Sequence, residues 1–124
     1  MPTDASAARN EGLPRTAIPV FRGRVSPVLD TCTRLCLLEP GRARGIRRKT
    51  LPVRGDTLFE RAEEIKKSGA CVVICGAVSN PLYNLLKERY VEIVCGITGD
   101  VDEVIQAYRN GTLSQARFRM PGAG

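Results

Sequence analysis

The chemistry open to this chain of 124 residues depends on its thiols and on its lack of histidine. It has five cysteines, at positions 32, 36, 71, 75 and 95, and no His. The missing imidazole excludes Ser/His and Cys/His catalysis, His-ligated zinc and the commonest general acid/base near neutral pH. The cysteine number is odd and the first residues lack the apolar core of a signal peptide, so we expect free thiols in a cytoplasmic protein. Thiolates bind soft metal ions and iron–sulfur clusters.

Four of the cysteines are candidate metal ligands. Cys32 and Cys36 form a C-x-x-x-C pair, a spacing that by itself specifies no metal. Cys75 and Cys95 each end an apolar run and precede a glycine, so a ligand role and plain packing are both open for them. Cys71 begins the continuously apolar run CVVIC, and we expect it to pack in the core.

Residues around these thiols could support an anionic ligand. Cys75 and Cys95 are followed by the turn sequences GAVS and GITG, whose glycines would let backbone N–H groups approach a sulfide or oxide. Two arginines in an earlier loop would add positive charge. The candidate cofactor-binding residues are Arg22, Arg24, Gly76, Ser79, Gly96, Thr98 and Gly99. For the glycines, an ordinary role in a turn is the alternative.

Residues 1–15 have no hydrophobic period, which predicts a disordered leader. The periodicity of the rest predicts one α/β domain over residues 16–124. Strands are expected at 16–21, 34–39 and 45–53, followed by a helix that begins at Asp56 or Thr57. A strand at 71–75, a helix from Ser79 or Asn80, a buried strand at 92–95 and a helix at 100–110 complete the order. This order predicts a five-stranded mixed sheet, with three antiparallel strands and then two parallel strands connected through helices that cover its faces. The arrangement is of the ribonuclease H-like class.

This topology predicts where a ligand would bind. In open α/β sheets, ligands bind beyond the carboxyl ends of the parallel strands. That edge would carry loop 22–31 and the turns after Cys75 and Cys95, and Cys32 begins the second strand from the same edge. We therefore expect the thiols of Cys32, Cys75 and Cys95 to converge there, with Cys36 slightly further along its strand.

Four segments of the chain match one family's motifs in that family's order. They are IPVF with VSPVLD within 18–30, ICGAVS with PL within 74–82, GITGDV with EVI within 96–105, and GTL at 111–113. Over residues 16–122 the chain resembles the dinitrogenase iron-molybdenum cofactor biosynthesis proteins of NifX type. The resemblance implies a ribonuclease H-like fold. It also implies a non-catalytic carrier or scaffold that binds an iron–sulfur or iron–molybdenum type cluster during nitrogenase-related cofactor assembly, with a cofactor-receiving metalloprotein as a partner. Some members use a histidine near the cofactor, and this chain has none.

The charge distribution suggests an alternative function. The net charge is +6, and residues 1–55 carry eleven basic and four acidic side chains. The stretch GRARGIRRK at 41–49 could recognise a protein or nucleic acid, which would make the chain a regulatory or binding module. We favour a solvated strand edge for this stretch and expect no nucleic-acid partner, because aromatic residues that could stack on bases are few. No apolar run is long enough for a membrane span, and strand 16–21 lacks the carboxylates that a two-metal nuclease needs.

Overall fold

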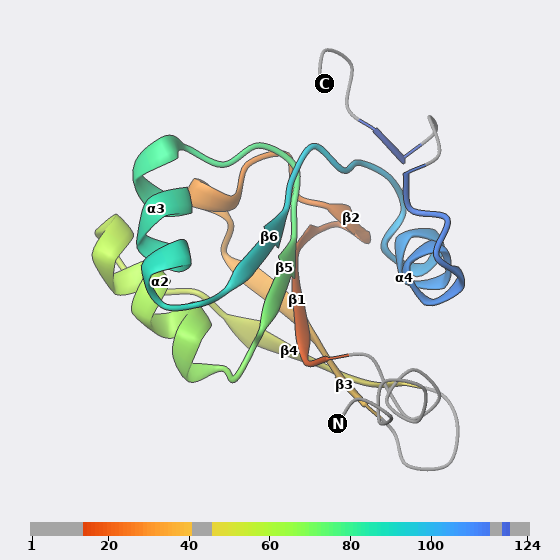
Figure 1. Ribbon diagram of the computed structural model, residues 1–124, viewed down its shortest axis with the longest axis horizontal. Helices are drawn as coiled ribbons and strands as arrows, with labels where there is room; N and C mark the ends of the chain where they lie inside the picture. Colours follow the sequence, from red (N-terminus) through yellow and green to blue (C-terminus); the bar gives the residue numbers. More distant parts are fainter. Residues whose placement is uncertain (1–13, 41–45, 115–117, 120–124) are drawn as a thin grey trace.

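The computed structural model describes residues 14–40, 46–114 and 118–119 (Figure 1). In chain order the elements are β1 (Thr16–Phe21), β2 (Arg24–Val25), the 3-10 helix η1 (Leu29–Thr31), β3 (Arg34–Pro40), β4 (Ile46–Pro52), α2 (Leu58–Lys67), β5 (Val72–Ile74), α3 (Asn80–Glu88), β6 (Glu92–Val94) and α4 (Val101–Asn110). The predicted alternation of strands and helices is confirmed. No helix in the described ranges is both long and apolar enough to cross a membrane.

The sheet has the order β4-β3-β1-β5-β6. β1 pairs antiparallel with β3, and β3 pairs antiparallel with β4, whereas β1, β5 and β6 run parallel. The predicted fold class is therefore confirmed, with one additional strand. β2 returns from β1 through a two-residue turn in which Arg22 and Gly23 both have positive φ, 52° and 80°, as type I′ hairpins require.

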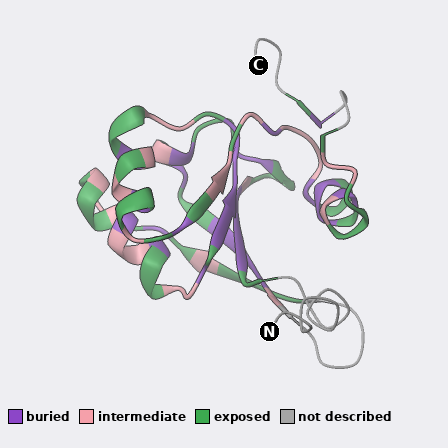
Figure 2. Cartoon of the chain, viewed as in Figure 1, coloured by how far each residue is buried: buried purple, intermediate pink, exposed green. Residues whose placement is uncertain are grey.

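Helices cover both faces of the sheet, as Figure 1 shows for α2 and α3 on one side and α4 on the other. Side chains along a strand alternate between these two layers. On β3, Leu35 and Leu37 pack in the layer with α2 and α3, whereas Cys36 and Leu38 pack in the layer with α4. The buried residues of Figure 2 follow the central strands, and each fully buried leucine contributes roughly 2 kcal/mol of hydrophobic stabilisation.

Side-chain caps fix where the helices begin. Thr57, rather than Asp56, caps α2 through a reciprocal capping box with Glu60. Ser79 caps α3, and Asp100 caps α4 by accepting from two backbone N–H groups.

Two local predictions about the strands are wrong. Cys71 is exposed rather than packed in the core, because β5 begins at Val72 and Cys71 lies in the turn before it. The strand β6 is at the sheet edge, with Glu92 exposed and Ile93 and Val94 half-buried, instead of being covered on both faces. The predicted leader lies outside the described residues apart from positions 14 and 15, as do positions 41–45 of the basic stretch.

Candidate functional site

The carboxyl ends of β1, β5 and β6 meet at one edge of the sheet, which we call the rim. Backbone hydrogen bonds connect its loops: the Gly96 N–H donates to the Gly76 carbonyl at 2.8 Å, and the Val25 N–H donates to the Gly99 carbonyl at 2.9 Å. The predicted cofactor-binding residues lie at this edge: Arg24 in β2, and Arg22, Gly76, Ser79, Gly96, Thr98 and Gly99 in the loops. Their common position is observed, whereas their part in binding stays a prediction.

The structure divides the four candidate thiol ligands between two layers. Cys32 and Cys75 are buried in the layer with α2 and α3, and Cys36 is buried in the layer with α4. Because the sheet lies between the layers, Cys36 cannot share a metal ion with Cys32 and Cys75, contrary to the expectation of one set. Cys95 is exposed at the rim. Among the described residues, no three His, Cys, Asp or Glu side chains are close enough together to hold a metal ion.

Cys75 and Cys95 are opposite one another on neighbouring parallel strands. The register of β5 and β6 pairs Val73 with Ile93 and Ile74 with Val94, so the next pair is Cys75 with Cys95. One hydrogen bond of the ladder extends to this position, because the Cys75 N–H donates to the Val94 carbonyl at 2.9 Å. This is the pair of the predicted thiol site that two neighbouring strands place side by side.

Burial keeps two of the thiols protonated. The pKa of Cys75 is raised to about 12, mainly by burial and further by Cys95, Cys32 and Asp30. The pKa of Cys32 is raised to about 11, again mainly by burial, although Arg61 lowers it in part. Each of these two thiols would therefore have to lose a proton before it could ligate a metal.

Carboxylates of the chain itself occupy the helix N-termini near the rim. Asp30 accepts a hydrogen bond from the Ser79 N–H at 2.9 Å and a second one from the Ser79 hydroxyl, at the start of α3. Asp100 does the same for the N–H groups of Asp102 and Glu103 in α4. The positive ends of both helices are thus already compensated, so Ser79 has a structural role whether or not it also binds a ligand. Sequence reasoning missed the Asp30–Ser79 contact because 49 residues separate its partners.

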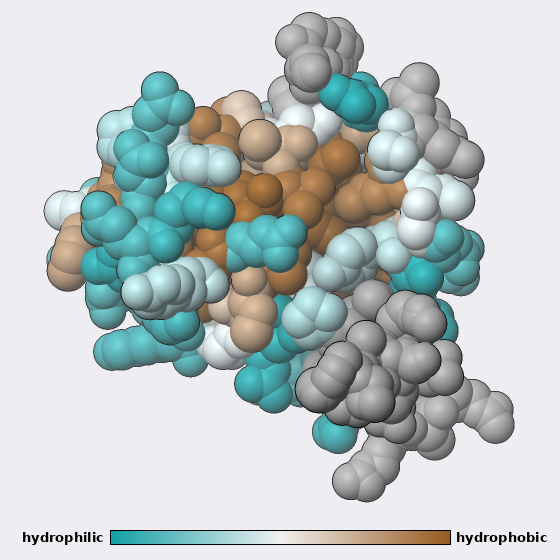
Figure 3. All heavy atoms as spheres, in the orientation of Figure 1, coloured by the Kyte–Doolittle hydropathy of each residue, from teal (hydrophilic) through white to brown (hydrophobic). Residues whose placement is uncertain are grey.

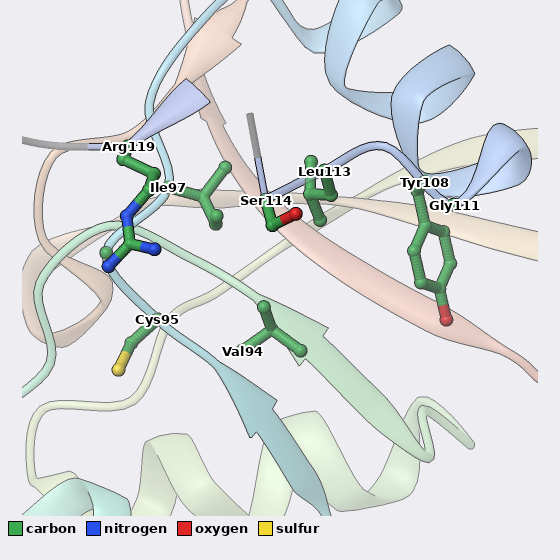
Figure 4. A pocket seen from close by; sticks show the side chains of 9 residues that line it. Val94, Cys95, Ile97, Tyr108, Gly111, Leu113, Ser114 and Arg119 are labelled. Carbon is green, nitrogen blue, oxygen red and sulfur yellow. The ribbon is translucent and has the colours of Figure 1, made fainter. Parts of the chain in front are cut away.

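A cavity of about 460 Å³ opens beside the rim, between β6, α4 and the segment that follows α4. Its walls are mostly apolar, from Val94, Ile97, Tyr108 and Leu113, and Arg119 extends toward its Cys95 end (Figure 4). On the face drawn in Figure 3, apolar residues form a band between polar flanks over the region of β6. The Cys95 sulfur points away from the cavity. Sequence reasoning missed this cavity because the predicted order of elements ends with the helix at 100–110, whereas Leu113 and Arg119 form part of the wall.

Two of the three basic residues in the described part of the basic stretch, positions 46–49, form ion pairs. Arg48 donates to Asp102 of α4 at 2.8 Å, and Lys49 lies 3.7 Å from Glu39 of β3. Both belong to the edge strand β4, and Arg47 beside them is exposed. These contacts fit the solvated strand edge that we favour for this stretch.

No family model and no curated protein matches this sequence. Several solved structures share its fold. PH0822 superimposes with a TM-score of 0.71 and 19% identity, over 81% of this chain and 93% of that one. A protein of Methanocaldococcus jannaschii, provisionally named a dinitrogenase, gives a TM-score of 0.64 and 19% identity, over 86% of this chain and 99% of that one. The apo form of the orange protein from Desulfovibrio gigas gives 0.66 and 18%, over 88% and 98%.

These likenesses show the fold. They agree with the fold that the sequence resemblance implies, because each matches nearly its whole length to this chain. At 18–19% identity, these likenesses do not extend to ligands.

Proposed function

We propose that this protein is a non-catalytic carrier for an iron–sulfur or iron–molybdenum type cluster in nitrogenase-related cofactor assembly, and that the cluster docks at the rim beside Cys95. The observation that carries the proposal is the paired position of Cys75 and the exposed Cys95 at the carboxyl edge of the parallel strands. The NifX-type sequence resemblance supports it. So does a fold shared with a protein provisionally named a dinitrogenase and with an orange protein described in its apo form, a term for a protein without its bound group.

The chemistry of the rim suits a soft, anionic cargo. Cys95 offers an exposed sulfur that can ligate iron without opening the core. Cys75 could add a second ligand once it is deprotonated, and a nearby metal cation favours that step. The remaining ligands would be sulfides of the cargo itself, because no third protein group is within metal-binding reach among the described residues.

Positive charge on neighbouring loops would hold the cargo electrostatically. Arg22 lies in the β1–β2 turn and Arg24 directly follows it, and Arg119 reaches the Cys95 end of the cavity. A cargo held by one or two thiolates and by charge stays accessible at the sheet edge. This arrangement suits transfer to a cofactor-receiving metalloprotein better than permanent storage.

Anaerobic reconstitution tests this function. The full chain is incubated with iron and sulfide, with and without molybdate, and bound metal and visible absorption are measured after desalting. We expect Cys95→Ser to lower metal affinity by about tenfold or more, as is typical when a metal site loses a group that supports it. Cys71→Ser is the matched control, since Cys71 is also exposed but lies at the opposite end of β5. Equal metal binding by the two variants, or none by the wild type, would reject the proposal.

A further inference from the structure

We propose that Cys75 and Cys95 form a reversible disulfide, which makes the rim a redox-controlled site. If the two cysteines are joined, they cannot ligate a metal cluster. This loss of cluster binding rests on the proposed function. The disulfide itself does not depend on it.

The register of β5 and β6 brings the two cysteines side by side. Cys75 and Cys95 directly follow the paired residues Ile74 and Val94, and adjacent strands are about 4.8 Å apart. Disulfides join Cα atoms that are roughly 4.4–6.8 Å apart, so no large backbone movement is needed. Cys71, by contrast, is opposite Val91 in the same register and has no thiol across from it.

The ladder between β5 and β6 is irregular at this pair. The Cys75 N–H donates to the Val94 carbonyl, but the Cys75 carbonyl accepts from Ile97, one residue later than a regular parallel ladder would place the donor. The extra residue is Gly96, whose φ of 78° is readily adopted only by glycine. This bulge ends the regular ladder directly after Cys95, and bulges commonly re-aim a neighbouring side chain.

Both thiols belong to the same side of the sheet. Val73 and Cys75 pack in the layer with α2 and α3, and so does Ile93, two residues before Cys95. Alternation along β6 therefore directs Cys95 to that side as well. Figure 4 agrees, because the Cys95 sulfur points away from the cavity that lies on the α4 side.

Exposure sets the order of reaction. The buried Cys75 has 0% of its surface accessible, whereas Cys95 is exposed. A small-molecule disulfide, such as glutathione disulfide, therefore meets Cys95 first. Cys32 is buried and belongs to neither β5 nor β6, so it is the weaker competitor as the second thiol.

The reaction is a two-step thiol–disulfide exchange. The Cys95 thiolate attacks one sulfur of the small disulfide, which forms a mixed disulfide and releases one thiolate. Cys75 then loses its proton to solvent and attacks the Cys95 sulfur. The Cys75–Cys95 bond forms, the mixed disulfide breaks and the second small thiolate leaves. Overall, two protein thiols are oxidised by two electrons and one small disulfide is reduced to two thiols.

Mass spectrometry of the full chain tests the disulfide. Cys71 and Cys75 share the tryptic peptide 68–87, whereas Cys95 is in peptide 90–109, so the experiment uses the Cys71→Ser background. After treatment with glutathione disulfide at mildly alkaline pH, we expect peptides 68–87 and 90–109 to be linked and free of glutathione. In the double variant Cys71→Ser/Cys75→Ala, we expect a stable glutathione adduct on Cys95. The same adduct on Cys95 in both proteins, without a link between the peptides, would overturn the proposal.

A second measurement separates this inference from the carrier function. Reduced and oxidised Cys71→Ser protein are each reconstituted with iron and sulfide. We expect the reduced form to bind and the oxidised form to bind at least several-fold less. If the peptides are linked but neither form binds metal, the disulfide stands and the carrier function fails. If the linked form binds as well as the reduced form, redox control of the site is wrong.

Discussion

At the scale of single residues, the fully buried Cys75 thiol should make stability depend on alkaline pH. Its pKa is about 12 in the folded protein, mainly because burial disfavours the thiolate, against an ordinary value of 9.0. Between these values the unfolded chain releases a proton that the folded chain retains. Stability is therefore fully present below pH 9 and falls as the pH rises, by about 1.4 kcal/mol per pH unit from this residue.

Urea unfolding at about pH 8 and about pH 10 measures this effect. We expect the wild type to lose about 1.4 kcal/mol more than Cys75→Ala over that interval, because the variant lacks the titrating group. The readout is the change in the free energy of unfolding between the two pH values, since removal of the buried sulfur lowers the stability of the variant at every pH. Cys71→Ala is the control for the removal of an exposed thiol. Identical slopes for the wild type and Cys75→Ala would show that Cys75 titrates normally.

At the scale of elements, Gly76 holds the turn after β5 against the loop before η1. A Cβ atom there would lie 2.6 Å from the Pro27 carbonyl oxygen. That oxygen accepts from the Ala77 N–H at 2.8 Å, and the Ala77 carbonyl in turn accepts from Leu29. Close backbone packing therefore requires glycine at position 76. This requirement is enough to explain the residue, which the sequence analysis named as a candidate cofactor-binding residue.

Two glycine substitutions distinguish close packing from backbone conformation. Gly76→Ala should lower the free energy of unfolding by about 2–3 kcal/mol, because the clash involves backbone that cannot move without breaking hydrogen bonds. Gly23→Ala should cost only about 1 kcal/mol, since Gly23 has positive φ but its Cβ would meet nothing within 4 Å. Chemical unfolding of both variants provides the comparison. Equal losses would mean that the contact with Pro27 relaxes easily.

The elements themselves were largely predictable, because their signals are local. Thr57, Ser79 and Asp100 are cap residues directly before periodic apolar runs, and each begins its helix. The grouping of Cys36 with Cys32 in one set of ligands was wrong, although the alternation of side chains along the strand could have shown this. In RLCLLE, Leu35 and Leu37 share one face of the strand, so Cys36 must point to the other.

At the scale of the whole molecule, the topology could be predicted and the cavity could not. Parallel strands connected by helices permit few arrangements, so the rim followed from the order of elements. The cavity depends on how Leu113 and Arg119 return over β6 after α4, through the antiparallel bridge between Ile97 and Arg119. That contact joins distant segments, and nothing in the local sequence near either partner indicates it.

The net charge of +6 is also a property of the whole molecule, and charge-reversal variants can test the alternative binding module. Reversing Arg47, Arg48 and Lys49 to Glu changes the net charge by the same amount as reversing the exposed Lys67, Lys87 and Arg109. If attraction to nucleic acid is only a net-charge effect, both triple variants should weaken binding to a short DNA duplex equally, and binding should fade by about 0.15 M salt. Electrophoretic shifts over a salt series measure this.

Because Arg48 and Lys49 form ion pairs with Asp102 and Glu39, we expect the two triple variants to weaken DNA binding equally. Binding that survives salt and is lost only in the β4 variant would instead make that strand a recognition surface.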